Sequence, residues 1–375
     1  MAKRKLERCG LDQYSAVLSQ VGIVTVKDIL EESPLRLLQI LDMSVHDLKV
    51  LLDQLSELVA PKSRTALEIH RERSLRCCYI SSGLSTIDDK LRGGLPFGSI
   101  TEVCGPPGIG KTQFCLNVCL RSLLRPLSFG RSHQDGSSSH GLESSSVVYI
   151  DTELKFDSNR ILEIVSNLPV PLSSLEAEGL LERIHIYRPT TCKDLLDLIE
   201  VTIQSVIIEN CVRLVVIDSI AALAKKENLN EADKEQYLVR LAGLLKEIGD
   251  ESNCCILITN QISAVSVPAR GIQDQSPAGT LDGLCDHVPL AAGDNTLMKA
   301  SLGSIWHHCV STRLMMYLDE TGTTAVAAAV GSRAGQFTRQ RVLSVMKSPV
   351  SEHCSVCYDI SVVGVGEVGV FVAML

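Results

Sequence analysis

The chain has 375 residues, 45% of them hydrophobic, and a formal net charge of −8. This length suits one large α/β domain and a smaller one, because single cores usually stop growing near about 250–300 residues. The acidic balance argues against a protein that coats duplex DNA by bulk charge, so contact with nucleic acid must come from local groups. The longest run of small apolar residues, 325–330, is too short to span a bilayer, and we expect no membrane association.

The 14 cysteines fall in apolar runs, where a reduced thiol acts as a small hydrophobic side chain. This usage is typical of a reducing intracellular compartment. Cys354 and Cys357, with His353 beside them, have the spacing of half a zinc site. Because the sequence has no second such pair at finger spacing, we expect no zinc there.

Residues 1–60 are predicted to form a small all-helical domain, because leucines recur at helical spacing in four segments. These segments are 11–21, 26–30, 34–41 and 45–58. Ser33 is expected to cap the third helix, with Pro34 at its first helical position. The residues that follow, 61–76, lack a sustained apolar stripe and are the predicted linker.

The hairpin between the last two of these helices, 41–44, bears on what the domain binds. A DNA-binding helix-hairpin-helix has a glycine there, which brings backbone amides close to phosphate. This hairpin has no glycine, and its Asp42 would repel phosphate. We therefore favour a packing or partner module over a DNA-reading domain.

Residues 77–375 are predicted to form an α/β domain around the stretch 105–112, Gly-Pro-Pro-Gly-Ile-Gly-Lys-Thr. This stretch fits the phosphate-loop pattern G-x-x-x-x-G-K-[ST]. An apolar, partly β-branched run at 99–103 precedes it and an apolar helix pattern at 113–120 follows it, as the motif requires. We expect a nucleoside triphosphate site rather than a glycine-rich turn without a ligand. Its predicted contact residues are Gly105, Pro106, Pro107, Gly108, Ile109, Gly110, Lys111, Thr112 and Gln113.

Each part of this loop has a predicted task. The glycines let the backbone curl and expose successive N–H groups, and the helix N-terminus adds partial positive charge. Lys111 is expected to pair with the β- and γ-phosphate oxygens. The hydroxyl of Thr112 is expected to bind Mg²⁺.

The apolar run 146–151 is a predicted strand that leads directly to Glu153. In parallel sheets, functional carboxylates belong at the carboxyl ends of strands, where the phosphate loop also lies. Glu153 is therefore our candidate for polarising the attacking water. A solvated acid on a loop is the alternative.

Two later strands also end in polar side chains. The run 213–218 ends in Asp218, which is expected to hold Mg²⁺ through water beside the phosphate loop. The run 254–261 ends in Gln261, whose amide is suited to hydrogen-bond the γ-phosphate or its water and to report its presence.

The segments after these two strands, 225–235 and 263–299, are long and polar or glycine-bearing, which predicts functional loops. Their cations are Lys225, Lys226, Lys234, Arg270 and Lys299. Surface excursions are predicted at 128–146 and 320–340, and further strands at 304–318, 341–346 and 358–371. Strand–helix alternation followed by a run of strands predicts a mostly parallel sheet with flanking helices and an antiparallel edge.

Taken together, these motifs resemble the RecA-like recombinases of eukaryotes over almost the whole chain. The segments that carry the resemblance are Ile100-Thr-Glu-Val-Cys-Gly105, Tyr149-Ile-Asp-Thr-Glu153, Leu214-Val-Val-Ile-Asp218-Ser219, Ile258-Thr-Asn-Gln261 and Val310-Ser-Thr-Arg-Leu314. Within that family the chain is most similar to the B-type DNA-repair paralogue. The strings that distinguish it are Gly105-Pro-Pro-Gly108, Leu302-Gly-Ser-Ile-Trp306, Ser311-Thr-Arg-Leu314 and Lys347-Ser-Pro349.

The resemblance implies a RecA-like P-loop ATPase core with ATP and Mg²⁺ as cofactors. It implies that Lys111 and Thr112 bind the nucleotide and metal, and that Glu153 activates water. Asp218 would support the metal, and Gln261 would sense the γ-phosphate. The loops after these last two residues would line a DNA-binding centre. A nuclear location also follows from the resemblance.

Three departures from the family bear on assembly. The linker stretch Lys62-Ser-Arg-Thr-Ala-Leu67 lacks the Phe-x-x-Ala segment through which strand-exchange members polymerise. Lys347 stands where the ATP-cap strand usually has Asp, and the hairpin glycine is absent. These changes suggest a mediator that assembles with sister paralogues. Lys347 would either bring its ammonium to a neighbour's γ-phosphate or end an exposed strand and touch nothing.

We therefore expect an ATP-binding protein of homologous-recombination repair with a weak, DNA-dependent ATPase activity. With sister paralogues it would assist recombinase assembly on single-stranded or branched DNA. A nucleotide-dependent scaffold with little turnover is the second interpretation, and a RecA-core helicase-type motor is the third. Stimulation of turnover by single-stranded DNA separates the first two, and duplex unwinding identifies the motor.

Overall fold

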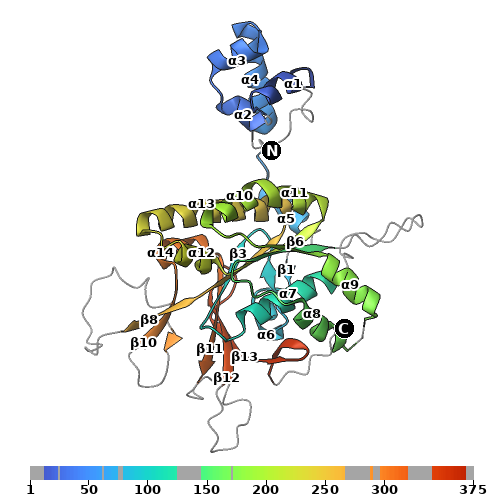
Figure 1. Cartoon of the computed structure of the whole chain (residues 1–375), viewed down its shortest axis with the longest axis vertical. Helices are drawn as coiled ribbons and strands as arrows, with labels where there is room; N and C mark the ends of the chain where they lie inside the picture. Colours follow the sequence, from blue (N-terminus) through green and yellow to red (C-terminus); the bar gives the residue numbers. More distant parts are fainter. Residues whose placement is uncertain are drawn as a thin grey trace, which may run out of the picture. The chain divides into compact units, whose positions relative to one another are not determined.

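A computed structural model describes residues 12–23, 26–60, 63–74, 79–124, 145–169, 172–266, 288–289, 296–319 and 340–368. It divides the chain into two compact units, Met1–Ser74 and Leu75–Leu375, whose elements are labelled in Figure 1. Much of the two predicted excursions and of the segment 263–299 lies outside the described residues, as does Arg270.

The first unit is all helical in its described part. Its helices are α1 Asp12–Gln20, α2 Val26–Glu31, α3 Pro34–Leu41, α4 Val45–Val59 and α5 Ala66–Ser74. The first four confirm the predicted helices, and α5 lies inside the segment predicted as linker. Leucines and other aliphatic residues at helical spacing form its core, namely Leu18, Ile23, Val26, Ile29, Leu37, Leu48 and Leu55.

Local chemistry sets where α3 begins and ends. The Ser33 hydroxyl accepts a hydrogen bond from the Arg36 N–H at 3.2 Å, and Pro34 is the first helical residue, which confirms the predicted start. Asp42 ends the helix with φ 48°, in the left-handed region that Gly usually occupies and that Asp tolerates.

The second unit contains a nine-stranded sheet in its described part, ordered β14-β13-β12-β11-β3-β7-β6-β4-β5. Its strands are β3 Ile100–Cys104, β4 Ser146–Asp151, β5 Ile184–Tyr187, β6 Val212–Asp218, β7 Cys255–Asn260, β11 Thr312–Asp319, β12 Gln340–Lys347, β13 Cys354–Ser361 and β14 Gly364–Glu367. Neighbours from β11 to β5 pair in parallel, and those from β11 to β14 pair antiparallel. This order confirms the predicted mostly parallel sheet with an antiparallel edge.

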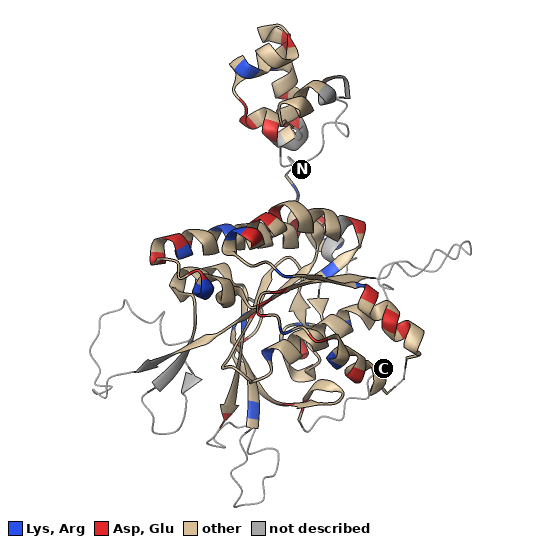
Figure 2. Cartoon of the chain, viewed as in Figure 1, with Lys and Arg blue, Asp and Glu red and all other residues tan. Residues whose placement is uncertain are grey.

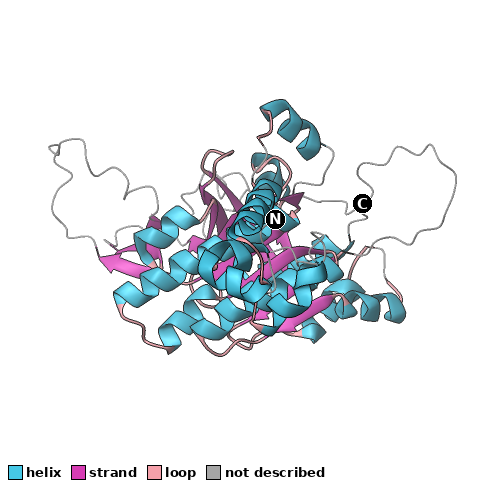
Figure 3. Ribbon diagram, turned by 90° about the horizontal axis from the view of Figure 1, so that it is seen from above, coloured by secondary structure: helices cyan, strands magenta, loops and turns pink. Residues whose placement is uncertain are grey.

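Helices lie on both sides of this sheet (Figures 1 and 3). They are α6 Ser85–Lys90, α7 Lys111–Leu124, α8 Ser158–Ser166, α9 Ser174–Glu182, α10 Cys192–Asp197, α11 Gln204–Glu209, α12 Ile220–Lys226, α13 Glu231–Ser252 and α14 Gly303–Cys309. A π-helical stretch, η2 Leu198–Ile203, joins α10 to α11. Short strands complete the unit: β1 Tyr79–Ile80, β2 Leu95–Pro96, β8 Ile262–Ser266, β9 Val288–Pro289 and β10 Thr296–Ala300. None of the described helices combines the length and apolar character needed to cross a membrane.

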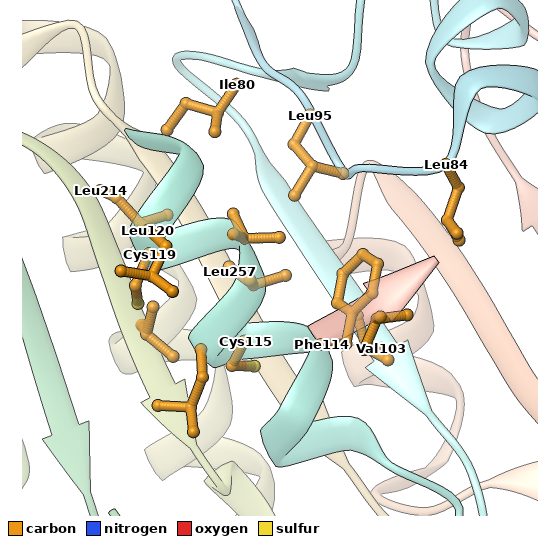
Figure 4. Packing of buried hydrophobic residues seen from close by; sticks show 14 of the residues in the cluster. Ile80, Leu84, Leu95, Val103, Phe114, Cys115, Cys119, Leu120, Leu214 and Leu257 are labelled. Carbon is orange, nitrogen blue, oxygen red and sulfur yellow. The ribbon is translucent and has the colours of Figure 1, made fainter. Parts of the chain in front are cut away.

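Strand alternation assigns each central side chain to one of two cores. On β4, Val147 and Tyr149 belong to the cluster that includes α7, whereas Val148 and Ile150 belong to the cluster that includes α13. Successive residues of a strand point to opposite faces of the sheet. When helices cover both faces, the sequence of the strand is therefore a continuous apolar run. Figure 4 shows the first cluster, in which side chains of α7 meet Leu214 and Leu257 from the strands.

Three predicted elements were wrong. The segment 358–371 is not one strand, because β13 ends at Ser361 and the chain turns back at Gly364, with φ 99°, into β14, which pairs antiparallel with β13. The segment 304–318 is not one strand, because Leu302 and Gly303 at φ 82° and 79° turn the chain into α14 before β11 begins. The segment 225–235 is not a long loop, because α12 extends to Lys226 and the Asn230 side chain caps α13, accepting from the Asp233 N–H at 2.9 Å. The Asn-x-x-Asp start was the signal for this second helix.

A buried ion pair joins β3 to its neighbour β11. The Arg313 Nε donates to Glu102 Oε2 at 2.6 Å, and the two side chains are 2% and 0% exposed. The other carboxylate oxygen accepts from Trp306 Nε1 at 2.8 Å and from Asn260 Nδ2 at 2.7 Å. Buried charges need such partners, and here they connect β3, β7, β11 and α14 next to the phosphate loop.

Arg313→Met should lower the free energy of unfolding by about 3–5 kcal/mol, because it leaves the buried Glu102 carboxylate without its counter-charge. Urea unfolding of the purified protein measures this. Arg240→Met is the matched control, since the Arg240–Glu200 pair is 57% and 41% exposed and should contribute less than about 1 kcal/mol. Equal losses in the two variants would contradict a special role for burial.

Candidate nucleotide-binding site

The phosphate loop connects β3 to α7, as the sequence predicts. Gly108 and Gly110 have φ of 77° and 115°, a region that favours glycine. Gly105 is needed for a different reason: a Cβ there would lie 2.6 Å from the Met316 carbonyl oxygen. Pro107 is exposed at the tip of the loop. The glycines of the motif thus satisfy both turn geometry and close packing.

Lys111 begins α7 and points back over the loop. Its Nζ donates to the carbonyl oxygens of Gly105 at 2.8 Å and Pro106 at 2.9 Å. Burial lowers the pKa of the Lys111 ammonium, and the carboxylates of Asp218 and Glu153 oppose that shift. The ammonium therefore lies within electrostatic reach of both predicted site acids.

Asp218 at the end of β6 accepts hydrogen bonds from three hydroxyl groups. Its Oδ2 accepts from Thr112 Oγ1 at 2.7 Å and from Tyr149 OH at 3.0 Å, and its Oδ1 accepts from Thr259 Oγ1 at 2.6 Å. The side chain is buried, and all of these groups offer oxygen atoms, the donor type that magnesium prefers. Thr112 and Asp218 therefore fit a Mg²⁺ ion beside the loop.

Glu153 is not the solvated loop acid of the alternative interpretation. Its Oε1 accepts from Ser219 Oγ at 2.5 Å and from Gln261 Nε2 at 3.4 Å, and its Oε2 forms an ion pair with Lys155 Nζ. Partial burial opposes ionisation of Glu153, but the hydrogen bonds from Lys155, Ser219 and Gln261 outweigh burial and hold the pKa of this carboxyl below its ordinary value. Glu153 is thus an ionised, restrained carboxylate.

Gln261 lies between a lysine and this carboxylate. Lys225 Nζ, at the end of α12, donates to Gln261 Oε1, while Gln261 Nε2 faces Glu153. A lysine ammonium can only donate, so it fixes the orientation of the amide with the NH₂ group toward the carboxylate. The predicted γ-phosphate sensor and the predicted base are therefore in direct contact.

The loop that carries Glu153 is fixed at its root by the buried side chain of Asp151. Asp151 accepts hydrogen bonds from the backbone N–H groups of Lys155 at 2.9 Å and Phe156 at 3.1 Å. Thr152 Oγ1 donates to the Ser219 carbonyl oxygen at 2.7 Å and accepts from the Ser219 N–H at 2.8 Å, which ties the ends of β4 and β6 together.

Gln113, the last predicted contact residue, has a protein partner. Its Oε1 accepts from Arg160 Nε at 2.7 Å, and another nitrogen of Arg160 donates to the Ser361 carbonyl oxygen. Arg160 thereby joins α8 to the first turn of α7 and to β13.

Lys347 does not match the interpretation in which it touches nothing. Its Nζ donates to the carbonyl oxygens of His307 at 2.7 Å and Val310 at 2.8 Å, at the C-terminal end of α14. A cation at that end satisfies carbonyls without helical partners. The ammonium therefore has partners within its own chain, which leaves the proposed contact with a neighbour's nucleotide without support.

The predicted DNA-facing cations have different surroundings. Lys225 contacts Gln261, Lys226 Nζ donates to the Thr190 carbonyl oxygen at 3.3 Å, and Lys234 pairs with Glu231 at 3.4 Å. Figure 2 shows both signs of charge along α13. The Lys299 side chain lies outside the described part of the structure.

Four residues of this site were missed from the sequence. Tyr149 and Thr259 hold Asp218, and Ser219 and Lys155 hold Glu153. Each lies within two residues of a strand end or of a predicted site acid, and that proximity was the available signal. Which hydroxyl or ammonium turns toward which acid depends on the pairing of strands far apart in the chain.

Comparison with known proteins relates this geometry to a family. A family model described as Rad51 matches residues 72–280. The chain is 34% identical to DNA repair protein RAD51 homolog 2 of Mus musculus, over 96% of each chain. It is 34% identical to the protein of that name from Homo sapiens, over 96% of this chain and 88% of the relative. DNA repair protein rhp57 of Schizosaccharomyces pombe is 25% identical over 94% and 96%. These similarities confirm the resemblance to RecA-like recombinases and their B-type paralogue.

Glu153→Gln should lower the free energy of unfolding at pH 7, and this difference should shrink on acidification. Since the folded pKa of Glu153 lies below its ordinary value of 4.5, the ionised form adds stability that is complete above pH 4.5. That stability is lost as the pH falls through the lower folded value. Urea unfolding at pH 7 and at about pH 4 measures the difference. Glu178→Gln, which changes an exposed acid on α9, is the control, and a difference independent of pH would contradict the expectation.

Proposed function

The chain belongs to the Rad51 family, and from this premise we propose that it is an ATP-binding, DNA-dependent ATP-hydrolysing protein of homologous-recombination repair. With sister paralogues it assists assembly of a recombinase on single-stranded or branched DNA in the nucleus. Its relatives from Mus musculus, Homo sapiens and Schizosaccharomyces pombe are named as DNA repair proteins, which supports the repair role.

One observation carries the ATPase part of this proposal. The carboxyl ends of β3, β4, β6 and β7 bring the phosphate loop, Glu153, Asp218 and Gln261 to the same edge of the sheet. In open α/β sheets this edge is where ligands bind. Thr112 contacts Asp218 at 2.7 Å across 106 positions of sequence, and this contact between the two proposed metal ligands supports the proposal.

The residues of the chain have separate tasks in this reaction. The loop N–H groups and Lys111 bind the phosphates, and Lys111 exchanges its carbonyl partners for phosphate oxygens. Thr112 and Asp218 would hold Mg²⁺, which would supply positive charge to neutralise the charge that develops on the phosphates. Glu153 orients water as an ionised carboxylate, and Gln261 links this carboxylate to the segment that follows β7.

A scaffold with little turnover is the second candidate function. The observation that favours it is the set of three side-chain donors on Glu153, because a carboxylate so engaged has a lowered basicity toward water. In that case bound ATP stabilises an interface, and hydrolysis is incidental.

Lys111→Ala should weaken ATP binding by about 2–4 kcal/mol, because charge-assisted contacts to phosphate are lost.

Glu153→Gln should keep ATP affinity and lower turnover by roughly a hundredfold. A fluorescent ATP analogue and single-stranded-DNA-stimulated phosphate release measure the two effects in the partner complex. Lys246→Ala, which changes an exposed lysine on α13, is the control. Unchanged ATP affinity in Lys111→Ala would refute the binding site, whereas turnover that does not respond to DNA would favour the scaffold.

Binding of single-stranded DNA should depend weakly on salt, because few local cations are available on an acidic chain. A slope of log affinity against log salt of roughly −3 is expected, since each neutralised phosphate contributes about −0.7. Replacing Lys225 and Lys226 together by Ala should make the slope shallower. Fluorescence anisotropy across a salt series tests this, with Lys246→Ala as the unaffected control, and a slope twice as steep would contradict it.

A further inference from the structure

Glu153 has an unusual neighbour for a residue that is to activate water. Lys155, two positions along the loop, forms an ion pair with Glu153 Oε2, and the two side chains are 59% and 16% exposed. The other oxygen, Oε1, accepts from Ser219 and Gln261. Both carboxylate oxygens therefore carry donors, and one of these donors is a full positive charge.

The position of Lys155 is fixed at its backbone and open at its side chain. Its N–H donates to buried Asp151 at 2.9 Å, and the next N–H, of Phe156, donates to the same carboxylate at 3.1 Å. From this fixed backbone the Lys155 side chain extends toward solvent, and its χ angles can rotate. The ammonium can thus leave Glu153 by side-chain rotation alone, without movement of the loop.

The contact has a chemical consequence for Glu153. A carboxylate is a better base when fewer cations stabilise its charge, and an ion pair with lysine is a strong, charge-assisted hydrogen bond. The pKa of Lys155 is raised, first by its hydrogen bond to Glu153, so each group stabilises the charge of the other. Because Lys155 also lowers the pKa of Lys111, its charge lies within electrostatic reach of the phosphate loop.

Resting on the proposed function, we propose that Lys155 is a positioning residue that holds Glu153 in a resting arrangement and slows ATP hydrolysis until its ammonium leaves the carboxylate. Lys155 therefore acts through Glu153, and its removal frees the carboxylate for water.

The first test uses protein without nucleotide. Lysine labelling with an amine-reactive ester, read by mass spectrometry, reports how readily each ammonium gives up its proton and its partner. Glu153→Gln should raise the labelling rate of Lys155 severalfold. Lys90, which pairs with Glu352 at 2.6 Å on a different surface, should label at its unchanged rate. An unchanged rate at Lys155 would show that the ion pair does not exist in solution and would overturn the proposal.

The second test measures turnover at saturating ATP and single-stranded DNA in the partner complex. Lys155→Met keeps the apolar stem and should raise kcat about threefold to tenfold, with KM for ATP changed less than about twofold. Lys155→Arg keeps the ion pair and should stay near wild type, whereas Lys90→Met is the control for loss of an exposed ion pair. Equal or lower kcat in Lys155→Met would overturn the proposal, because a lysine that assists the phosphates directly gives that result.

A double-mutant cycle separates action through Glu153 from any other route. In the Glu153→Gln background, Lys155→Met should leave the residual turnover unchanged, and a further rise would overturn the proposal. ATP affinity, measured in the same proteins, distinguishes the two levels of inference. If the wild-type protein binds ATP but Lys155→Met does not raise kcat, only the role of Lys155 is refuted. If the wild-type protein does not bind ATP, both the proposed function and the role of Lys155 are refuted.

Discussion

The site depends on one buried carboxylate, that of Asp218. Three hydroxyl groups donate to it, from the first turn of α7, from β4 and from β7. Burying a carboxylate is costly in free energy unless hydrogen bonds replace those to water. The arrangement of α7, β4 and β7 that brings their hydroxyls to Asp218 is therefore favoured over arrangements that leave this carboxylate without donors. The same contact sets the position of Thr112 relative to the sheet, and with Thr112 the whole phosphate loop.

The sequence predicted those parts of the fold and site whose signals are local. The phosphate loop, the strands that end at Asp151 and Asp218, and the capped start at Ser33 all rest on neighbouring residues, and the structure has them where expected. Apolar runs alone were ambiguous, because the run near Trp306 suits a buried helix as well as a strand. The turn at Gly303 decides between them, and its left-handed geometry is visible only in three dimensions.

Contacts between distant residues could not be predicted in this way. The pairing of Gln261 with both Lys225 and Glu153 requires β7 and β4 to lie on either side of β6, an order that sequence spacing does not contain. Lys347 illustrates the same limit. Its departure from the family pattern suggested a contact with another subunit, but the end of α14 lies beside β12 in the same chain and receives the ammonium.

The two ends of the segment that follows Gln261 are held together at its base. The Ser301 N–H donates to the Gln261 carbonyl oxygen at 2.9 Å, and the Ser301 carbonyl oxygen accepts from Asn260 Nδ2 at 2.9 Å. When the two ends of a loop are held together, the entropic cost of closing the loop grows only with the logarithm of its length. The segment is therefore a place where relatives can differ widely in length and composition while the amide of Gln261 keeps the same position.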